Sequence, residues 1–326
     1  MNSPPGVTLR RFEGDTDYAA MAVCINETAA ADGDERFETA EGLAHSYAYL
    51  ENCDPKTDML FAEADGEIVA YSRVMWHQVE GGDNERLYGL YGWVRPAWRR
   101  RGIGSTMLEA SEARLREIAA GHDHDGLAYF ETGAFDQDAG AGVLFAANGY
   151  DVAATDVEMV RPNLDGIPQA VLPDGLEVRP VTDDQIRQIW EASDEAFRDH
   201  WSYVPASEEY YAQYTSETFF DPSLWRVAWD GDEVAGQVRS FINKDENQHF
   251  GYQRGYTEDI SVRRPYRRRG LARALLLMSL EAVRDRGMTE AGLGVHVENP
   301  NDALSLYESV GFAAISRWFT YRKPFS

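Results

Sequence analysis

A strand-like segment, a basic loop and a helix-like segment occur twice in this chain, and this repeat limits its possible folds most strongly. Arg267-Arg-Arg-Gly-Leu-Ala272 stands between an alternating, β-branched run and an apolar-periodic run, as does Arg99-Arg-Arg-Gly-Ile-Gly104. A glycine-containing turn that leads into a helix exposes backbone N–H groups without intrahelical partners, and the helix dipole favours negative charge there. Each loop is therefore predicted to bind an anion such as a phosphate.

Other segments repeat in the same order and at nearly the same spacing. Strand-like runs at 7–12 and 176–181 precede hairpins with Asp-Gly turns at 59–71 and 225–236. Towards its end, each half contains a glycine followed by an aromatic residue, Gly149-Tyr150 and Gly311-Phe312. This order indicates duplication of a whole domain. The proline- and glycine-rich range 163–175 is the predicted linker, so we expect two α/β domains at 1–162 and 176–326.

Composition narrows the possible functions. The chain has 326 residues, 44% of them hydrophobic, and a formal net charge of −24, which argues against a nucleic-acid partner. The two cysteines, Cys24 and Cys53, are too few for a disulfide framework or a zinc site, so no metal is expected. The first residues lack the pattern of a signal peptide, and no apolar run is long enough to cross a bilayer. We expect a cytoplasmic protein without a membrane partner.

Both basic loops fit the (Gln/Arg)-x-x-Gly-x-(Gly/Ala) pattern and resemble the pyrophosphate-binding loop of the GNAT superfamily of N-acetyltransferases. The resemblance covers nearly the whole chain twice, and the tandem arrangement resembles the mycothiol synthases. It implies an α/β (α+β) fold with two GNAT-like domains, each a mixed, largely antiparallel sheet that splays after its fourth strand and is flanked by helices. It also implies acetyl-CoA as the cosubstrate.

The cofactor contacts implied by this resemblance in the second domain are Ile260, Ser261, Val262, Arg267, Arg268, Arg269, Gly270, Leu271, Ala272, Arg273, Asn299 and Asn301. Those in the first domain, which would hold a second CoA, are Val94, Arg99, Arg100, Arg101, Gly102, Ile103, Gly104 and Ser105. Backbone groups of 260–262 are expected to bond the pantetheine arm as an added strand would.

The resemblance places the catalytic acid at Tyr307, which stands four residues before Gly311. Phe145 occupies the matching position before Gly149 and cannot donate a proton. The second domain is therefore predicted to be catalytic and the first non-catalytic. Either Glu258 or Asp259 could accept the proton of the amine; because neighbouring strand residues face opposite sides, only one can reach the acceptor, and Glu258 is preferred.

The expected function is acetyl-CoA-dependent N-acetyl transfer to a small-molecule amine by direct attack. The aromatic-rich range 197–225 is expected to shape the acceptor site. A protein or peptide N-acetyltransferase and a non-catalytic acyl-CoA sensor are the alternatives. The oligomeric state is left open, although the internal duplication is consistent with a monomer.

Overall fold

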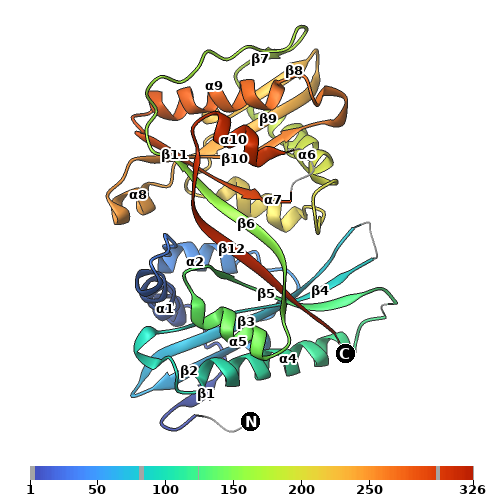
Figure 1. Cartoon of the computed structure of the whole chain (residues 1–326). Coiled ribbons are helices and arrows are strands. Elements are labelled where there is room, and N and C mark those ends of the chain that lie inside the picture. Colours follow the sequence, from blue (N-terminus) through green and yellow to red (C-terminus); the bar gives the residue numbers. More distant parts are fainter. Residues whose placement is uncertain (1–3, 81–83, 124, 299–301, 326) are drawn as a thin grey trace. The chain divides into compact units, whose positions relative to one another are not determined.

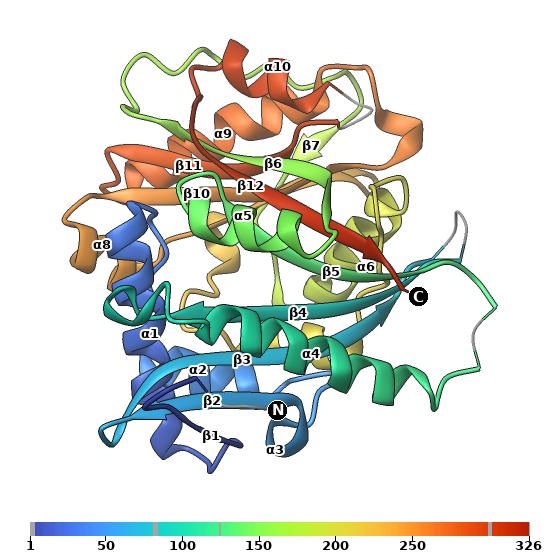
Figure 2. The ribbon, with the colours of Figure 1, turned by 60° about the horizontal axis from the view of Figure 1, so that its bottom comes forward.

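The computed structural model describes residues 4–80, 84–123, 125–298 and 302–325, which form two compact units. Unit 1 comprises Met1–Ala154, Ser207–Gln213 and Trp318–Ser326, and unit 2 comprises Thr155–Ala206 and Tyr214–Arg317. Each unit is built around one sheet covered by helices on both faces (Figures 1 and 2).

The sheet of unit 1 runs β1 (Thr8–Arg10), β2 (Met59–Ala64), β3 (Glu67–Gln78), β4 (Arg86–Val94), β5 (Ala128–Phe135) and the end of β12 (Ala313–Pro324). Its helical elements are α1 (Thr16–Asp32), α2 (Ala40–Tyr47), α3 (Pro55–Asp58), η1 (Pro96–Trp98), α4 (Ile103–Ala119) and α5 (Ala139–Ala147). In the helix α7 (Glu208–Ser216), residues up to Gln213 belong to unit 1 and those from Tyr214 onwards belong to unit 2.

The sheet of unit 2 runs β7 (Glu177–Val178), β8 (Arg226–Asp230), β9 (Glu233–Phe241), β10 (Arg254–Val262), β11 (Glu290–His296) and the end of β6 (Asp151–Arg161). Its helical elements are η2 (Asp183–Gln185), α6 (Ile186–Phe197), η3 (Pro222–Leu224), α8 (Lys244–Phe250), η4 (Arg264–Tyr266), α9 (Leu271–Asp285) and α10 (Ala303–Ser309).

Alternation along the strands sends apolar side chains to both faces of each sheet. In unit 1, Phe61 and Tyr71 pack with α1, whereas Ala62 and Ala70 pack with Ile103 of α4. In Figure 2, α4 lies across β2, β3 and β4. Unit 2 repeats this arrangement, with α6 covering one face and α9 the other.

The pairing of the central strands confirms the predicted fold class. Within each unit, neighbouring strands are antiparallel except for β4 with β5 and β10 with β11, which are parallel. The parallel pairs are short: β4 and β5 pair only as far as Gly89 and Glu131, and β10 and β11 only as far as Tyr256 and Gly292. Beyond these residues the two strands of each pair splay apart, and a ligand can bond their free backbone groups.

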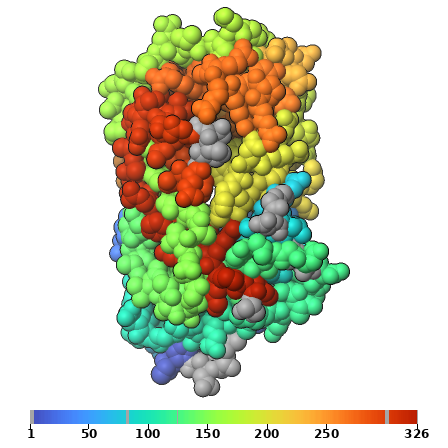
Figure 3. All heavy atoms as spheres, turned by 45° about the vertical axis from the view of Figure 1, so that its right-hand side comes forward, coloured from blue at the N-terminus to red at the C-terminus, as the bar shows by residue number. Residues whose placement is uncertain are grey.

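The last strand of each sequence half completes the sheet of the other half. Residues 156–161 of β6 pair with β11 of unit 2, and residues 318–324 of β12 pair with β5 of unit 1. The red end of β12 beside β5 shows this in Figure 1, and in Figure 3 its atoms lie among the green atoms of unit 1. The compact units therefore differ from the ranges 1–162 and 176–326, which follow the sequence repeat, because the chain exchanges its closing strands.

Candidate active site

The basic loop of unit 2 joins the end of β10 to α9 in a conformation that suits an anion. Arg268 and Gly270 adopt left-handed φ angles of 61° and 84°, and α9 begins directly after Gly270 without a side-chain cap. The first N–H groups of α9 are thus left without intrahelical acceptors at the positive end of the helix dipole. No atom lies within 4 Å of the position that a Cβ of Gly270 would occupy, so the approach to the loop is open.

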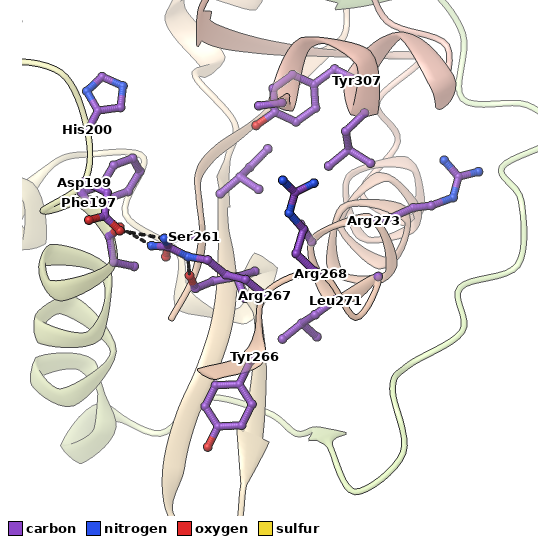
Figure 4. A pocket seen from close by; sticks show the side chains of 17 residues that line it. Phe197, Asp199, His200, Ser261, Tyr266, Arg267, Arg268, Leu271, Arg273 and Tyr307 are labelled. Carbon is purple, nitrogen blue, oxygen red and sulfur yellow. Dashed lines mark hydrogen bonds and ion pairs between the residues drawn. The ribbon is translucent and has the colours of Figure 1, made fainter. Parts of the chain in front are cut away.

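A pocket of about 300 Å³ extends from this loop between β10 and α10. Ten of the predicted cofactor and catalytic residues contribute to its wall: Ile260, Ser261, Val262, Arg267, Arg268, Gly270, Leu271, Ala272, Arg273 and Tyr307. Phe197 and His200 of the aromatic-rich range 197–225 also line it. The wall further contains residues that the sequence analysis did not name as contacts: Ala196, Asp199, Tyr266, Ala303 and Leu306. In Figure 4, Arg268 points from the loop into the pocket, and Tyr307 closes the opposite end.

Two of the predicted loop arginines are engaged within the protein. Arg267 donates to the carbonyl of Val262 at 2.9 Å and forms an ion pair with Asp199 at 2.7 Å, drawn as dashed lines in Figure 4. Hydrogen bonds from Arg264 and Arg267 lower the pKa of Asp199, so this carboxylate stays ionised. Arg269 donates to the carbonyl of Asp174 at 3.0 Å and does not line the pocket. Asn299 and Asn301 lie outside the described residues.

The strand β10 contains a bulge where it passes the pocket. Glu258 is opposite Arg239 of β9, but Ser261 is opposite Gln237, so β10 has one extra residue between these positions. Asp259 lies at the bulge with a left-handed φ of 49°. Bulges redirect side chains and interrupt pairing, and here the bulge lies at the start of the wall formed by 260–262.

The bulge sends the two candidate carboxylates to different partners. Glu258 accepts a hydrogen bond from the backbone N–H of Gly294 in β11 at 3.0 Å, whereas Asp259 pairs with Arg239 of β9 at 3.0 Å. Burial raises the pKa of Glu258 well above its ordinary value, and the negative charges of Asp259 and Glu158 raise it further. A carboxylate with a raised pKa is a stronger base, so Glu258 is suited to accepting a proton near neutral pH.

Tyr307 lies on α10 with 6% of its surface exposed. Burial raises the pKa of its phenol, and the negative charge of Glu258 contributes to the same rise. The phenol therefore stays protonated through the neutral range and can act as a proton donor. Tyr307 lines the pocket, whereas Glu258 and Asp259 do not; Glu258 acts on Tyr307 through its charge.

Unit 1 has a larger pocket, of about 500 Å³, at the corresponding loop. Gly102 has the same left-handed φ of 84° as Gly270, and α4 begins directly after it. Of the predicted contacts, Val94, Arg99, Arg100, Gly102, Gly104 and Ser105 line this pocket. Ile103 and Arg101 do not line it: Ile103 is buried, and Arg101 lies over the ring of Trp98 at 4.5 Å. Arg99 is paired with Asp32 at 2.5 Å, just as Arg267 is paired with Asp199.

The reactive end of the unit 1 pocket differs from that of unit 2. The register of β3 and β4 is continuous from Ala70–Val94 to Gln78–Arg86, so β4 has no bulge. Tyr91, opposite Arg73, takes the place that Glu258 has opposite Arg239. Phe145 packs with Tyr150 and Tyr321 where unit 2 has Tyr307. The described part of unit 1 thus lacks the bulge, and it has neither a carboxylate at the position of Glu258 nor a tyrosine at the position of Tyr307.

Comparison with known proteins identifies the repeated fold. The family described as "Acetyltransferase (GNAT) family" matches residues 186–312, and the "Acetyltransferase (GNAT) domain" matches residues 55–152. The chain belongs to the GNAT family of acetyltransferases. It is a tandem GNAT protein and an acetyl-CoA-dependent N-acetyltransferase. The pocket between the basic loop and Tyr307 is consistent with this cosubstrate, because its wall combines the open N-terminus of α9 with the strand segment 260–262.

Relatives of similar length support the tandem arrangement. A mycothiol acetyltransferase of Geodermatophilus obscurus is 28% identical over 301 residues, which cover 90% of each chain. That of Salinispora arenicola is 29% identical and covers 97% of this chain and 92% of its own. A GCN5-related N-acetyltransferase from Sphaerobacter thermophilus superposes with a TM-score of 0.76 at 25% identity, covering 99% and 97% of the two chains.

Two other properties bear on the class of site. Among the described residues, no group of three or more His, Cys, Asp or Glu side chains is arranged to hold a metal ion. No described helix combines the length and the apolar character needed to cross a membrane.

Proposed function

We propose that this protein acetylates the primary amine of a small molecule in unit 2, in the manner of a mycothiol synthase. The proposal rests on the asymmetry between the units: the bulge, Glu258 and Tyr307 occur together in unit 2 and have no counterpart among the described residues of unit 1. The relatives named mycothiol acetyltransferase support an amine-bearing thiol precursor as the acceptor.

In the proposed reaction, Glu258 accepts the proton that the acceptor amine must lose before it can attack. Its raised pKa and its anchor on the N–H of Gly294 suit a base held at a fixed position. Tyr307 donates its proton to the departing sulfur, because its phenol stays neutral in this pocket. Acetyl-CoA supplies an acetyl group already activated as a thioester. The loop after β10 and the exposed backbone of 260–262 hold its pyrophosphate and pantetheine arm.

We further propose that unit 1 binds a second CoA without reacting. Its pocket retains the left-handed glycine Gly102, the open start of α4 and the neighbouring Arg100. With Tyr91 and Phe145 at the reactive end, it offers neither a carboxylate base nor a phenolic acid at the positions used in unit 2.

A panel of amines tests the acceptor. Release of free CoA is followed with the amine precursor of mycothiol, with glucosamine and with a peptide that has a free N-terminus. We expect turnover with the precursor at a kcat/KM at least about tenfold above that with the amino-sugar, because a larger cognate acceptor adds binding energy in the transition state. Preference for the peptide would favour a protein N-acetyltransferase. CoA binding without turnover on any amine would favour a sensor.

Calorimetry tests the cofactor sites. Gly270→Asp places a carboxylate where the pyrophosphate would bind, and Gly102→Asp makes the matched change in unit 1. We expect wild type to bind two acetyl-CoA molecules and each variant to bind one, with turnover lost only in Gly270→Asp. A stoichiometry of one in wild type would remove the second site, and unaltered binding in Gly270→Asp would remove the first.

A further inference from the structure

A buried arginine lies behind the bulge of β10. Arg239 of β9 is only 4% exposed, and its guanidinium carbon lies 4.7 Å from the ring centres of both Trp190 and Tyr214. The ring of Trp225 is 5.8 Å away. The three rings come from α6, α7 and the segment before β8, and together they form an aromatic cage around one positive charge.

The cage leaves Arg239 with a single ion pair among the described residues. Its Nη2 lies 3.0 Å from a carboxylate oxygen of Asp259, while Nε and Nη1 have no hydrogen-bond partner in that part of the structure. A buried guanidinium needs a counter-charge, because removing an unpaired ion from water is unfavourable. Asp259 is therefore held firmly in place by Arg239, and the geometry of its backbone is held with it.

The held residue is the one that forms the bulge. Asp259 has a φ of 49°, a conformation that non-glycine residues adopt rarely and keep only where their surroundings fix it. It separates Glu258 from the strand residues 260–262 that line the pocket. A change at Asp259 would change the direction of Glu258 and the position of that strand together.

The same position in unit 1 lacks this device. Arg73 corresponds to Arg239 in the cross-strand register, but it is opposite Tyr91 in a strand without a bulge. Arg73 lies over the ring of Tyr47 at 5.1 Å and donates to the sulfur of Met75. The caged arginine with its carboxylate partner thus accompanies the bulge and Glu258, in the unit to which we assign the chemistry.

We propose that Arg239 is a positioning residue for acetyl transfer: by binding Asp259 inside the aromatic cage, it fixes the bulge that aims Glu258 at the acceptor and exposes 260–262 to the cofactor. The inference rests on the proposed function, because it gives Glu258 the role of base. It adds a residue that touches neither substrate and acts through its partner.

Arg239 pairs with Asp259, whose negative charge is one of those that act on Glu258. The groups that face Glu258 come from several elements: Asp259 of β10, Glu158 of β6, the N–H of Gly294 of β11, Tyr307 of α10 and, through Asp259, Arg239 of β9. From α6, Trp190 and Ser193 face β9 and β10, and α9 packs apolar side chains against the opposite face of the sheet. Arg239 is the cation in this set, and it offsets the charge of Asp259.

This arrangement gives opposite expectations for the two partners. Without the charge of Arg239, the uncompensated Asp259 would raise the pKa of Glu258 further, so the rising limb of the pH–rate profile would move to higher pH. Without the charge of Asp259, the pKa of Glu258 would fall, and the limb would move to lower pH. A role in folding alone would not produce two shifts of opposite sign.

The test compares Arg239→Met, Arg239→Lys, Asp259→Asn and the double variant Arg239→Met/Asp259→Asn. Asparagine suits position 259 because it tolerates a left-handed φ. We expect the rising limb of the kcat/KM profile to move about one unit to higher pH in Arg239→Met and by a similar amount to lower pH in Asp259→Asn. In the double variant it should lie near its wild-type position. Arg239→Lys keeps the charge and should keep the limb.

Arg73→Met is the matched control in unit 1, and we expect it to leave the pH–rate profile unchanged. Acetyl-CoA affinity is measured by calorimetry without any acceptor, and we expect Arg239→Met to weaken binding at the unit 2 site by about tenfold, because the strand 260–262 loses its fixed position. Equal pH limbs and equal affinities in Arg239→Met and Arg73→Met would overturn the inference. If Arg239→Met does not fold, an unmoved limb in Asp259→Asn overturns it. If wild type acetylates no amine, the proposed function fails, and the affinity comparison still decides the inference.

Discussion

Replacing Tyr307 by phenylalanine isolates the proposed acid, because the structure predicts a large effect on catalysis and a small one on stability. The Tyr307 hydroxyl makes no hydrogen bond to the described part of the protein, and its ring is already packed against the core and Phe312. Tyr307→Phe should therefore change the free energy of unfolding by less than about 1 kcal/mol. Loss of a positioned proton donor should lower kcat by about 10²- to 10⁴-fold, or about 2.7 to 5.4 kcal/mol in the activation free energy.

The assay measures kcat from CoA release at saturating acceptor, acetyl-CoA affinity by calorimetry and stability by urea denaturation. Affinity should be unchanged, since the loop and strand 260–262 are untouched. The matched variant is Phe145→Tyr, which adds the hydroxyl to unit 1 and should create no activity there, because β4 has no bulge and Tyr91 replaces the base. A Tyr307→Phe enzyme with undiminished kcat, stable and fully able to bind acetyl-CoA, would refute the assignment of the acid.

Two other substitutions follow from buried charges. Glu258→Gln should lower kcat by about 10²- to 10⁴-fold. The pKa of Glu258 is raised in the folded protein, so the stability of wild type falls as the pH rises from the ordinary carboxyl pKa towards the raised one. The variant should therefore be more stable than wild type near pH 8 and lose that advantage in acid. Urea denaturation at both pH values measures the difference. Arg322→Met leaves the half-buried Glu131 and Glu85 without the guanidinium that bonds them at 2.8 and 3.0 Å, and should destabilise unit 1 by about 3–5 kcal/mol. That loss should be larger at pH 8 than in acid, because burial already raises the pKa of Glu131 and protonation removes the unpaired charge; equal losses at both pH values would contradict it.

Features that depend on neighbouring residues in the sequence could be predicted from it. The left-handed Gly102 and Gly270, the helices that follow them and the contrast between Tyr307 and Phe145 each depend on a short segment. The fold class could also be predicted, because the periodicity of apolar residues indicates each helix and strand. The repeat indicates that both halves have the same order of elements.

The bulge was not predicted, because it is defined by pairing and not by a residue type. Tyr91 and Glu258 are both opposite an arginine, but β10 needs four steps to reach Val262 where β4 needs three to reach Val94. Aligning the two halves on their basic loops hides this difference. On a regular strand only one of Glu258 and Asp259 can reach the acceptor, and the sequence favours Glu258, whereas the bulge gives each carboxylate its own partner.

The cage around Arg239 was missed for a related reason. Trp190, Tyr214 and Trp225 belong to three segments that meet only in the folded unit, and the aromatic-rich range was expected to shape the acceptor site. A buried arginine among aromatic residues has no local signature, because its counter-ion and its rings are all distant in sequence from it.

The exchange of closing strands changes how lesions near the end of the chain should be interpreted. Lys323, close to the carboxyl end of the sequence, bonds Glu112 in α4 at 2.8 Å, and Arg322 bonds Glu131 in β5. A truncation or a bulky fusion at this end would thus loosen the sheet of unit 1, although the affected residues follow the segments of unit 2 in the sequence. A fall in protein level after such a change would reflect a weakened edge of the unit 1 sheet. Interpretation by sequence position alone would assign the defect to unit 2 instead.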